Sequence, residues 1–229
     1  MEGTRMKTDI TVVLDRSGSM ADIADDIVGG LNEFVAKQKA LEGEAHFTLV
    51  QFDDEYEVVH FRVPIGEVPP LTRQTYVPRG MTALLDAIGR TINEINARMD
   101  RMRTEERPDQ IVFAVATDGQ ENSSHEFTRR QIFSMIRSRE KLAQVDPSAR
   151  PTWEFVFLGA NQDAIEEGGQ MGFAAARAVD FDADAGGVHA AMSVMHSKIA
   201  LKRSMGHLAS MDFASSERSQ LSRKKRKTN

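Results

Sequence analysis

Three short segments carry small oxygen-bearing side chains at spacings that suit the binding of a hard cation. Asp15-Arg16-Ser17-Gly18-Ser19 places one carboxylate and two hydroxyls at alternate positions, directly after an apolar segment. Gly80-Met81-Thr82 adds a third hydroxyl, and Thr117-Asp118-Gly119 adds a second carboxylate after another apolar segment. Hard divalent cations prefer such donors, and Mg²⁺ takes about six oxygens, several of them from water. The candidate ligands are Asp15, Ser17, Ser19, Thr82 and Asp118.

Each segment also has a purely structural interpretation when it is taken alone. Asp15 and Ser17 could cap the first helix, because Asp and Ser are favoured at helix N-caps. Thr82 could cap the helix that it precedes, and Asp118-Gly119 is a common turn dipeptide. The combination of all three segments favours the cation site. A zinc site is not predicted, because the six His are scattered and His-Glu-x-x-His does not occur.

The elements that must position these residues alternate between apolar strands and amphipathic helices. The strands are expected at residues 10–14, 47–52, 56–63, 111–115, 155–158 and 178–181, and the helices at 23–35, 84–99, 123–144, 164–171 and 187–205. Ser123 and Glu126 fit a capping box at the start of the third helix. Only Asp53-Asp54-Glu55 separates the second and third strands, which allows a solvated hairpin turn but no parallel crossover.

This alternation predicts an α/β fold of the Rossmann-like, doubly wound kind. We expect a mostly parallel six-stranded sheet of order 3-2-1-4-5-6, with strand 3 as an antiparallel edge and helices on both faces. Ligands of such sheets bind outside the carboxyl ends of the strands, where the strand order reverses. Asp15 ends strand 1 and Asp118 follows strand 4, so both lie at that reversal, and the loop that carries Thr82 can reach the same edge.

Taken together, the three segments resemble the metal-ion-dependent adhesion site (MIDAS) of the von Willebrand factor A (vWA) domain. The family pattern is Asp-x-Ser-x-Ser, then a separate Thr, then a separate Asp, and the resemblance spans roughly residues 8–205. It implies that the hydroxyls of Ser17, Ser19 and Thr82 are metal ligands and that Asp15 and Asp118 anchor the waters of the metal. The implied metal is Mg²⁺, with Mn²⁺ and Ca²⁺ as alternatives.

The resemblance also implies a function. The chain looks like an intracellular, single-domain member of the family that is not an enzyme and binds an acidic side chain of a protein partner through the cation. It implies an adaptor role in a larger assembly, with AAA+ ATPases as candidate partners, and a last helix, about 187–205, that is the candidate moving element. Residues beside the three segments are candidates for setting specificity: Arg16, Met20, Met81, Gln120, Glu121 and Asn122.

Charge divides the 229 residues unevenly. We expect a short polar segment 1–8, a vWA-like domain 9–206 and a basic, disordered tail 207–229. Residues 215–229 hold six Lys or Arg and one Glu, while the whole chain has a net charge of −5, which leaves about −10 for the remainder. The basic run 223–227 suggests nucleic-acid, anionic-lipid or localisation binding as an alternative to a merely solvated end.

The composition argues against several classes of protein, among them disulfide-bonded, secreted and membrane-spanning ones. With 41% hydrophobic residues the chain can bury a core, and the absence of cysteine excludes disulfides and thiolate chemistry. Residues 1–8 lack the apolar region of a signal peptide, and no stretch of about 18 apolar residues is present, so we expect a cytoplasmic protein without a membrane span.

Two rival functions belong to other classes. A metal-dependent phosphotransferase or phosphatase of the haloacid dehalogenase-like kind would also place an Asp at the end of strand 1, but it needs a second Asp at the position of Ser17. A nucleic-acid-associated protein would act through the basic tail. Nucleotide binding is disfavoured, because neither a P-loop nor a Gly-x-Gly-x-x-Gly segment occurs.

Overall fold

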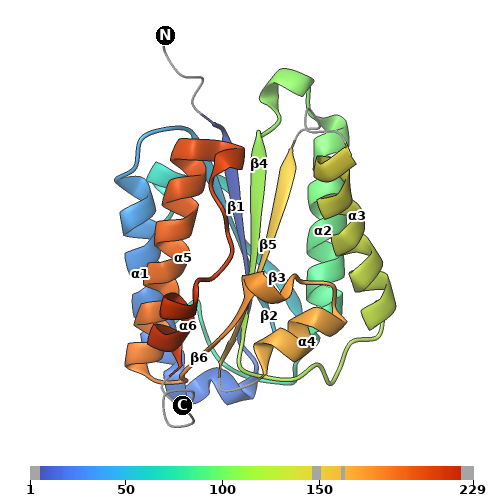
Figure 1. Cartoon of the computed structure of the whole chain (residues 1–229). Helices are drawn as coiled ribbons and strands as arrows, with labels where there is room; N and C mark the ends of the chain where they lie inside the picture. Colours follow the sequence, from blue (N-terminus) through green and yellow to red (C-terminus); the bar gives the residue numbers. More distant parts are fainter. Residues whose placement is uncertain (1–5, 146–150, 161–162, 223–229) are drawn as a thin grey trace.

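A six-stranded sheet forms the centre of the molecule (Figure 1). The computed structural model describes residues 6–145, 151–160 and 163–222. The strands lie in the order β3-β2-β1-β4-β5-β6, and all neighbouring pairs are parallel except β2 and β3. Their bounds are β1 (Thr8–Asp15), β2 (Ala45–Phe52), β3 (Tyr56–Pro64), β4 (Gln110–Thr117), β5 (Thr152–Ala160) and β6 (Ala178–Phe181). The predicted fold class, strand order and antiparallel edge are confirmed.

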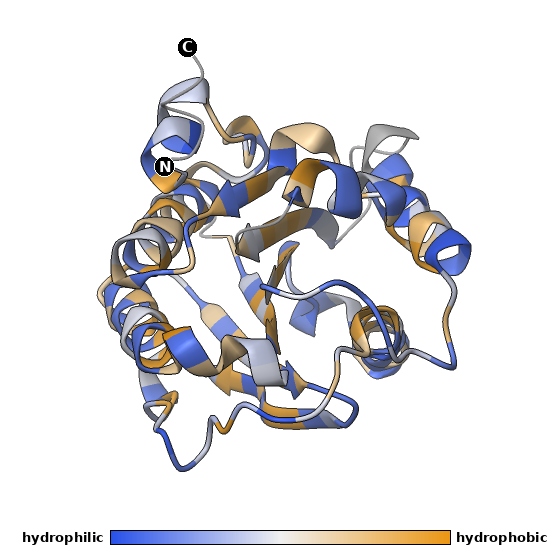
Figure 2. Ribbon diagram, turned by 90° about the horizontal axis from the view of Figure 1, so that it is seen from below, coloured by the Kyte–Doolittle hydropathy of each residue, from blue (hydrophilic) through white to orange (hydrophobic). Residues whose placement is uncertain are grey.

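Helices cover both faces of the sheet, as expected for parallel strands. Their bounds are α1 (Ala24–Lys39), α2 (Leu84–Arg101), α3 (Arg129–Val145), α4 (Ala164–Gln170), α5 (Ala185–Met205) and α6 (Ser215–Leu221). In Figure 1, α1 and α5 lie on one side of the sheet and α2 and α3 on the other. Figure 2 looks along the sheet from below and shows mainly hydrophobic strands between these two layers.

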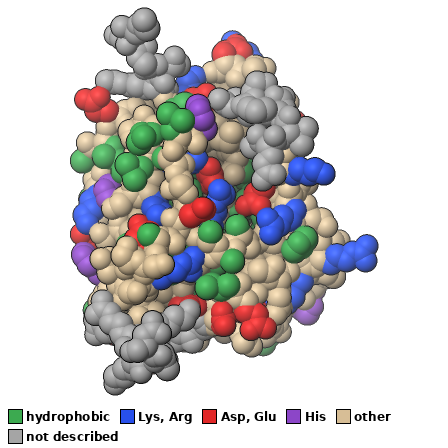
Figure 3. All heavy atoms as spheres, viewed as in Figure 1, with side chains coloured by type: hydrophobic (Ala, Val, Ile, Leu, Met, Phe, Trp, Pro, Cys, Tyr) green, Lys and Arg blue, Asp and Glu red, His purple; other side chains and the backbone are tan. Residues whose placement is uncertain are grey.

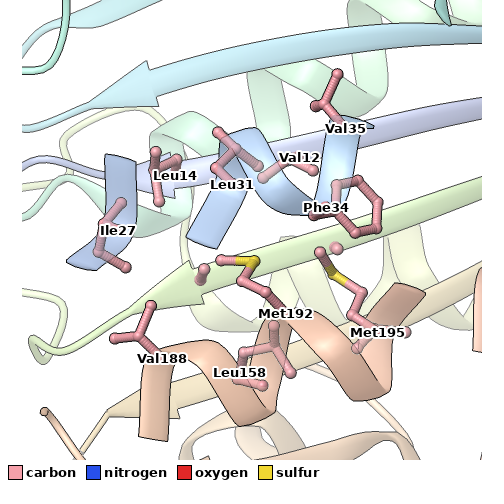
Figure 4. Packing of buried hydrophobic residues seen from close by; sticks show 14 of the residues in the cluster. Val12, Leu14, Ile27, Leu31, Phe34, Val35, Leu158, Val188, Met192 and Met195 are labelled. Atoms are coloured by element: carbon pink, nitrogen blue, oxygen red, sulfur yellow. The ribbon is translucent and has the colours of Figure 1, made fainter. Parts of the chain in front are cut away.

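The alternation of side chains along each strand divides the apolar core in two. Val12 and Leu14 of β1 join the cluster under α1 and α5, whereas Val13 joins the cluster under α2 and α3. Figure 4 shows the first cluster, in which the Met192 side chain extends from α5 toward α1. Gly30 allows this close contact, because a Cβ there would lie 3.1 Å from the side chain of Met192. Because both faces of the sheet are packed against helices, the strands are fixed relative to one another, and so are the loops at their carboxyl ends.

The start of α3 differs from the prediction. The capping box at Ser123 and Glu126 is wrong, because α3 begins at Arg129. Thr128 and Gln131 form the reciprocal pair instead, with the Thr128 N–H donating to Gln131 Oε1 (2.8 Å) and the Gln131 N–H donating to Thr128 Oγ1 (3.3 Å). The preceding residues stay in a loop because Asp86 of α2 accepts the N–H groups of residues 125–127 at 2.8–2.9 Å.

The expectation of a disordered tail from residue 207 is wrong for its described part. Leu221 at the end of α6 is fully buried, and its carbonyl oxygen accepts the N–H of Asp182 (3.0 Å). Lys198 of α5 forms an ion pair with Glu217 of α6 (2.9 Å). Acidic and basic side chains are interspersed on the face of the molecule that Figure 3 shows. Packing to the body therefore orders residues 207–222, while the basic run 223–227 lies outside the described residues. Among the described helices, none is long and apolar enough to cross a membrane.

Candidate metal centre

Asp15 lies at the carboxyl end of β1, next to the end of β4, as predicted from the strand order. The residue is fully buried, and one of its carboxylate oxygens, Oδ1, accepts the N–H of Ser17 (2.6 Å). The other oxygen accepts the hydroxyl of Thr117, the last residue of β4. The hydroxyl of Tyr76 donates to the Asp15 backbone carbonyl (2.7 Å). These contacts hold the Asp15 carboxylate in one orientation.

The two serines connect the first segment to Asp118. Ser17 Oγ lies 3.2 Å from Ser19 Oγ, and the Ser19 hydroxyl donates to Asp118 Oδ1 (2.6 Å). Ser17 is buried, whereas Ser19 is exposed at the surface. Ser17 precedes the 3-10 helix Gly18–Ile23 but makes no side-chain capping bond to it. The capping interpretation of this hydroxyl is therefore wrong, and the oxygens of both segments converge on one place.

Thr82 completes the set of oxygens. A Cβ at position 119 would lie 3.0 Å from Thr82 Oγ1 and 3.6 Å from Ser19 Oγ, so both hydroxyls lie beside Gly119. Thr82 does not cap α2, whose N-cap is Ala83. Its backbone is held by Asn122: the Thr82 N–H donates to Asn122 Oδ1 (2.9 Å), and the Asn122 N–H donates to the Thr82 carbonyl (3.1 Å). The three segments thus meet at the carboxyl edge, at the lower end of the sheet in Figure 1.

The electrostatics of this edge disfavour two bare carboxylates. Burial raises the pKa of Asp15 to about 6, although the hydrogen bonds from Thr117 and Ser17 act in the opposite direction. Burial also raises the pKa of Asp118, against the hydrogen bond from Ser19. Both carboxylates would gain from a nearby positive charge, because a bound cation favours their charged form.

The chemistry of the oxygens fits a hard divalent cation. Among the described residues, no group of three or more His, Cys, Asp or Glu could hold a metal ion. The oxygens that converge here are three hydroxyls and two carboxylates, and an ion that keeps several waters needs no more. The glycine at position 119 leaves the space next to Thr82 and Ser19 free of a side chain.

No protein-family model matches the chain, and no curated protein matches it. Solved structures do match. The vWF domain of the type V pili tip protein Mfa5 from Porphyromonas gingivalis superposes with a TM-score of 0.60 at 11% identity, covering 90% of this chain and 99% of that one. The chain has the fold of a von Willebrand factor A domain.

Two longer proteins contain a similar domain. A von Willebrand factor type A protein from Catenulispora acidiphila has a TM-score of 0.53 at 15% identity, covering 84% of this chain and 42% of that one. Proximal thread matrix protein 1 from the mussel byssus, solved with a zinc-occupied MIDAS motif, has a TM-score of 0.55 at 16% identity, covering 86% and 46%. This chain therefore spans less than half the length of either protein.

The vWA fold buries two of the residues that we expected to set specificity. Met20 is fully buried, and Arg16 is 5% exposed, so their assignment to a partner surface is wrong. Glu121 is also occupied, because its carboxylate accepts the N–H of Leu85 in the first turn of α2 (2.9 Å). Met81, at 55% exposure, remains accessible. Gln120 and Asn122 are likewise exposed.

Three residues around the site were missed from the sequence: Tyr76, Thr117 and Asp53. Asp53 was assigned to a solvated turn, but its side chain is fully buried. It directly follows β2, the neighbour of β1, so the rule that selected Asp15 and Asp118 also applies to it. Tyr76 contacts the site from a loop, through the Asp15 carbonyl, and no local pattern identifies it.

Proposed function

We propose that this vWA-fold chain is a metal-dependent protein-interaction module that binds a carboxylate of a protein partner through a divalent cation. The carrying observation is the continuous set of oxygens from Ser17 through Ser19 to Asp118, with Thr82 beside it. The set runs from the buried Ser17 to the exposed Ser19 and the half-buried Asp118, so a ligand bound there is open to solvent on one side.

The candidate ligands are of two kinds, charged carboxylates and neutral hydroxyls. Asp15 and Asp118 supply two negative charges, while Ser17, Ser19 and Thr82 supply neutral oxygens. A bound divalent cation supplies a nearly neutralised centre with a coordination position for an incoming carboxylate. Hydroxyl and carboxylate oxygens favour Mg²⁺, with Mn²⁺ and Ca²⁺ as alternatives.

The surface beside the oxygens indicates what else the partner presents. Val77 and Met81 are 52% and 55% exposed, and both lie on the loop that carries Thr82. A partner segment with an Asp or Glu next to an apolar side chain complements this combination. From the resemblance to the vWA family we further propose a non-enzymatic adaptor in a cytoplasmic assembly, with an AAA+ ATPase as the candidate partner.

A metal titration tests the proposal. Calorimetric titration of the metal-stripped protein with Mg²⁺ and with Mn²⁺ should show saturable one-site binding. The double variant Ser17→Ala/Ser19→Ala should lose it, because two of the three hydroxyls are removed. Ser134→Ala/Ser138→Ala is the matched control, since both of these hydroxyls lie on the exposed face of α3 and donate to carbonyls of their own helix. No binding by the wild type, or unchanged binding by the first variant, would contradict the proposal.

A further inference from the structure

A second buried carboxylate lies next to the candidate metal centre and does not belong to it. Asp53 Oδ2 accepts hydrogen bonds from Arg16 Nε (3.0 Å) and Arg79 Nε (2.9 Å). Its Oδ1 accepts the N–H of Glu55 (2.6 Å). The Asp53 side chain is fully buried, whereas the Arg79 side chain is 53% exposed. We refer to Asp53, Arg16 and Arg79 as the Asp53 clasp.

The two arginines belong to the two loops that carry the hydroxyls. Arg16 lies between Asp15 and Ser17, and Arg79 lies three residues before Thr82. Outer carboxylates strengthen the same arrangement, because Arg16 also pairs with Glu57 and Arg79 with Glu55. One carboxylate therefore joins the serine loop to the threonine loop.

Backbone hydrogen bonds follow the same path. The Arg79 N–H donates to the Arg16 carbonyl (2.8 Å), and the Gly18 N–H donates to the Gly80 carbonyl (3.2 Å). The Ala83 N–H, immediately after Thr82, donates to the backbone carbonyl of Asp53 itself (2.8 Å). The threonine loop is thus held between the turn after β2 and the serine loop.

Gly80 shows how closely these segments approach. Its φ of +65° lies in the left-handed region, which favours glycine. A Cβ there would lie only 1.8 Å from Asp54 Oδ1, and the same oxygen accepts the N–H of Met81 (3.2 Å). The path of the loop to Thr82 therefore depends on the turn that begins at Asp53.

We propose that Asp53 is a positioning residue for the metal centre: by holding Arg16 and Arg79 together, it fixes the distance between Ser17 and Thr82. The metal part of this inference rests on the proposed function. Asp53 does not touch the converging oxygens, and it acts only through the two loops. Without the clasp, a cation would have to order the threonine loop on binding, so its affinity would fall.

The chain offers a matched control at the opposite end of the sheet. Asp9 of β1 is also buried and accepts hydrogen bonds from Arg62 Nε (3.1 Å) and Arg98 Nη2 (2.7 Å). Asp53→Asn and Asp9→Asn each remove a buried carboxylate shared by two guanidiniums. We expect Asp53→Asn to weaken Mg²⁺ binding by about 10–100-fold, the range for groups that orient metal ligands, and Asp9→Asn to leave it unchanged.

Hydrogen exchange of the metal-free protein gives a second measurement, independent of any metal. Backbone amides of residues 16–20 and 79–83 should exchange faster in Asp53→Asn than in Asp9→Asn, relative to the amides of β4. Arg79→Ala should also speed the exchange of these amides. Because the Arg79 side chain is half exposed, this variant should still fold, so faster exchange in it would not reflect misfolding.

The outcomes separate this inference from the proposed function. Unchanged exchange in both loops of Asp53→Asn, or unchanged Mg²⁺ affinity in a wild type that binds Mg²⁺, would overturn the role of Asp53. Equal losses of affinity in Asp53→Asn and Asp9→Asn would also overturn it, because the effect would then be general destabilisation. If the wild type binds no Mg²⁺, the proposed function fails, and the exchange measurement still decides whether the clasp holds the loops.

Discussion

Two buried carboxylates at the same edge of the sheet, Asp15 and Asp53, have opposite surroundings. Within the described chain, the donors to the Asp15 carboxylate are neutral, the N–H of Ser17 and the hydroxyl of Thr117. Burial dominates there and raises its pKa to about 6. Burial also disfavours the charged form of Asp53. Hydrogen bonds from Arg79, the Glu55 N–H and Arg16 outweigh burial there and hold the pKa of Asp53 below its usual value.

The difference indicates where an added cation would gain most. Asp53 already has two guanidiniums, so a further positive charge would meet repulsion there. Among the residues that the structure describes, no guanidinium pairs with Asp15, and the pKa of Asp118, the second carboxylate of the site, is also raised by burial. The protein thus keeps one carboxylate pair uncompensated and uses a neighbouring ion-pair network to shape the loops around it.

Exchanging the Asp15 carboxylate for an amide gives the largest effect expected on metal binding. Asp15→Asn should abolish saturable Mg²⁺ binding, because half of the negative charge at the site is lost. The metal-free variant should be at least as stable as the wild type, since burial disfavours the charge and an amide oxygen can still accept the Ser17 N–H. Calorimetry and urea unfolding measure the two quantities. If Asp15→Asn bound Mg²⁺ with wild-type affinity, the Asp15 carboxylate would not contribute to the metal site.

The same exchange at Asp53 should have the reverse effect on stability. Asp53→Asn leaves the buried Arg16 guanidinium without the carboxylate that it shares with Arg79. Removing one partner of a buried ion pair lowers the free energy of unfolding by about 3–5 kcal/mol; the exposure of Arg79 and the pairing of Arg16 with Glu57 place the expected loss at the lower end of that range. Urea unfolding at neutral pH measures it. If Asp53→Asn and Asp15→Asn were equally stable, the two carboxylates would not differ as described.

Gly119 tests how closely the site is packed. Gly119→Ala should weaken Mg²⁺ binding by roughly tenfold, because its Cβ would crowd Thr82 Oγ1, and changes beside metal ligands act on this scale. Gly29→Ala in α1 is the control, since nothing lies within 4 Å of its new Cβ and the helix should gain about 0.4–1 kcal/mol. A Gly119→Ala protein with wild-type affinity would mean that Thr82 is not near the bound ion.

Much of this arrangement was predictable because it depends on strand order. Apolar segments of four to eight residues, joined by amphipathic helices, determine a parallel sheet, and the sheet brings Asp15 and Asp118 to one edge. Thr82 followed from its place before α2. The ligand roles of these residues stay predictions, whereas their convergence is observed.

The failures of prediction have one physical cause, which is contact between residues far apart in the sequence. Ser123 resembles a helix start, but Asp86 binds the following amides from another helix. The seven-residue α6 is too short to be stable alone and forms because Leu221 is buried against the body. Asp53 looks like a solvated turn residue until two arginines from different loops are placed beside it.

Acidification should give the smallest effect on stability. Its direction shows whether the charged Asp53 stabilises or destabilises the folded protein. The pKa of Asp53 is lower in the folded protein than in the unfolded chain, where an Asp titrates at about 3.9. The unfolded state therefore binds the proton more readily, so the stability from Asp53 is present above about pH 4 and is lost as the pH falls through the folded pKa. The difference in free energy of unfolding between the wild type and Asp53→Asn should accordingly shrink below about pH 4. Urea unfolding at several pH values between neutrality and pH 3 measures it, with Asp9→Asn as the reference for general acid effects. A difference that grows on acidification would mean that burial, rather than the two guanidiniums, dominates at Asp53, and the contrast with Asp15 would disappear.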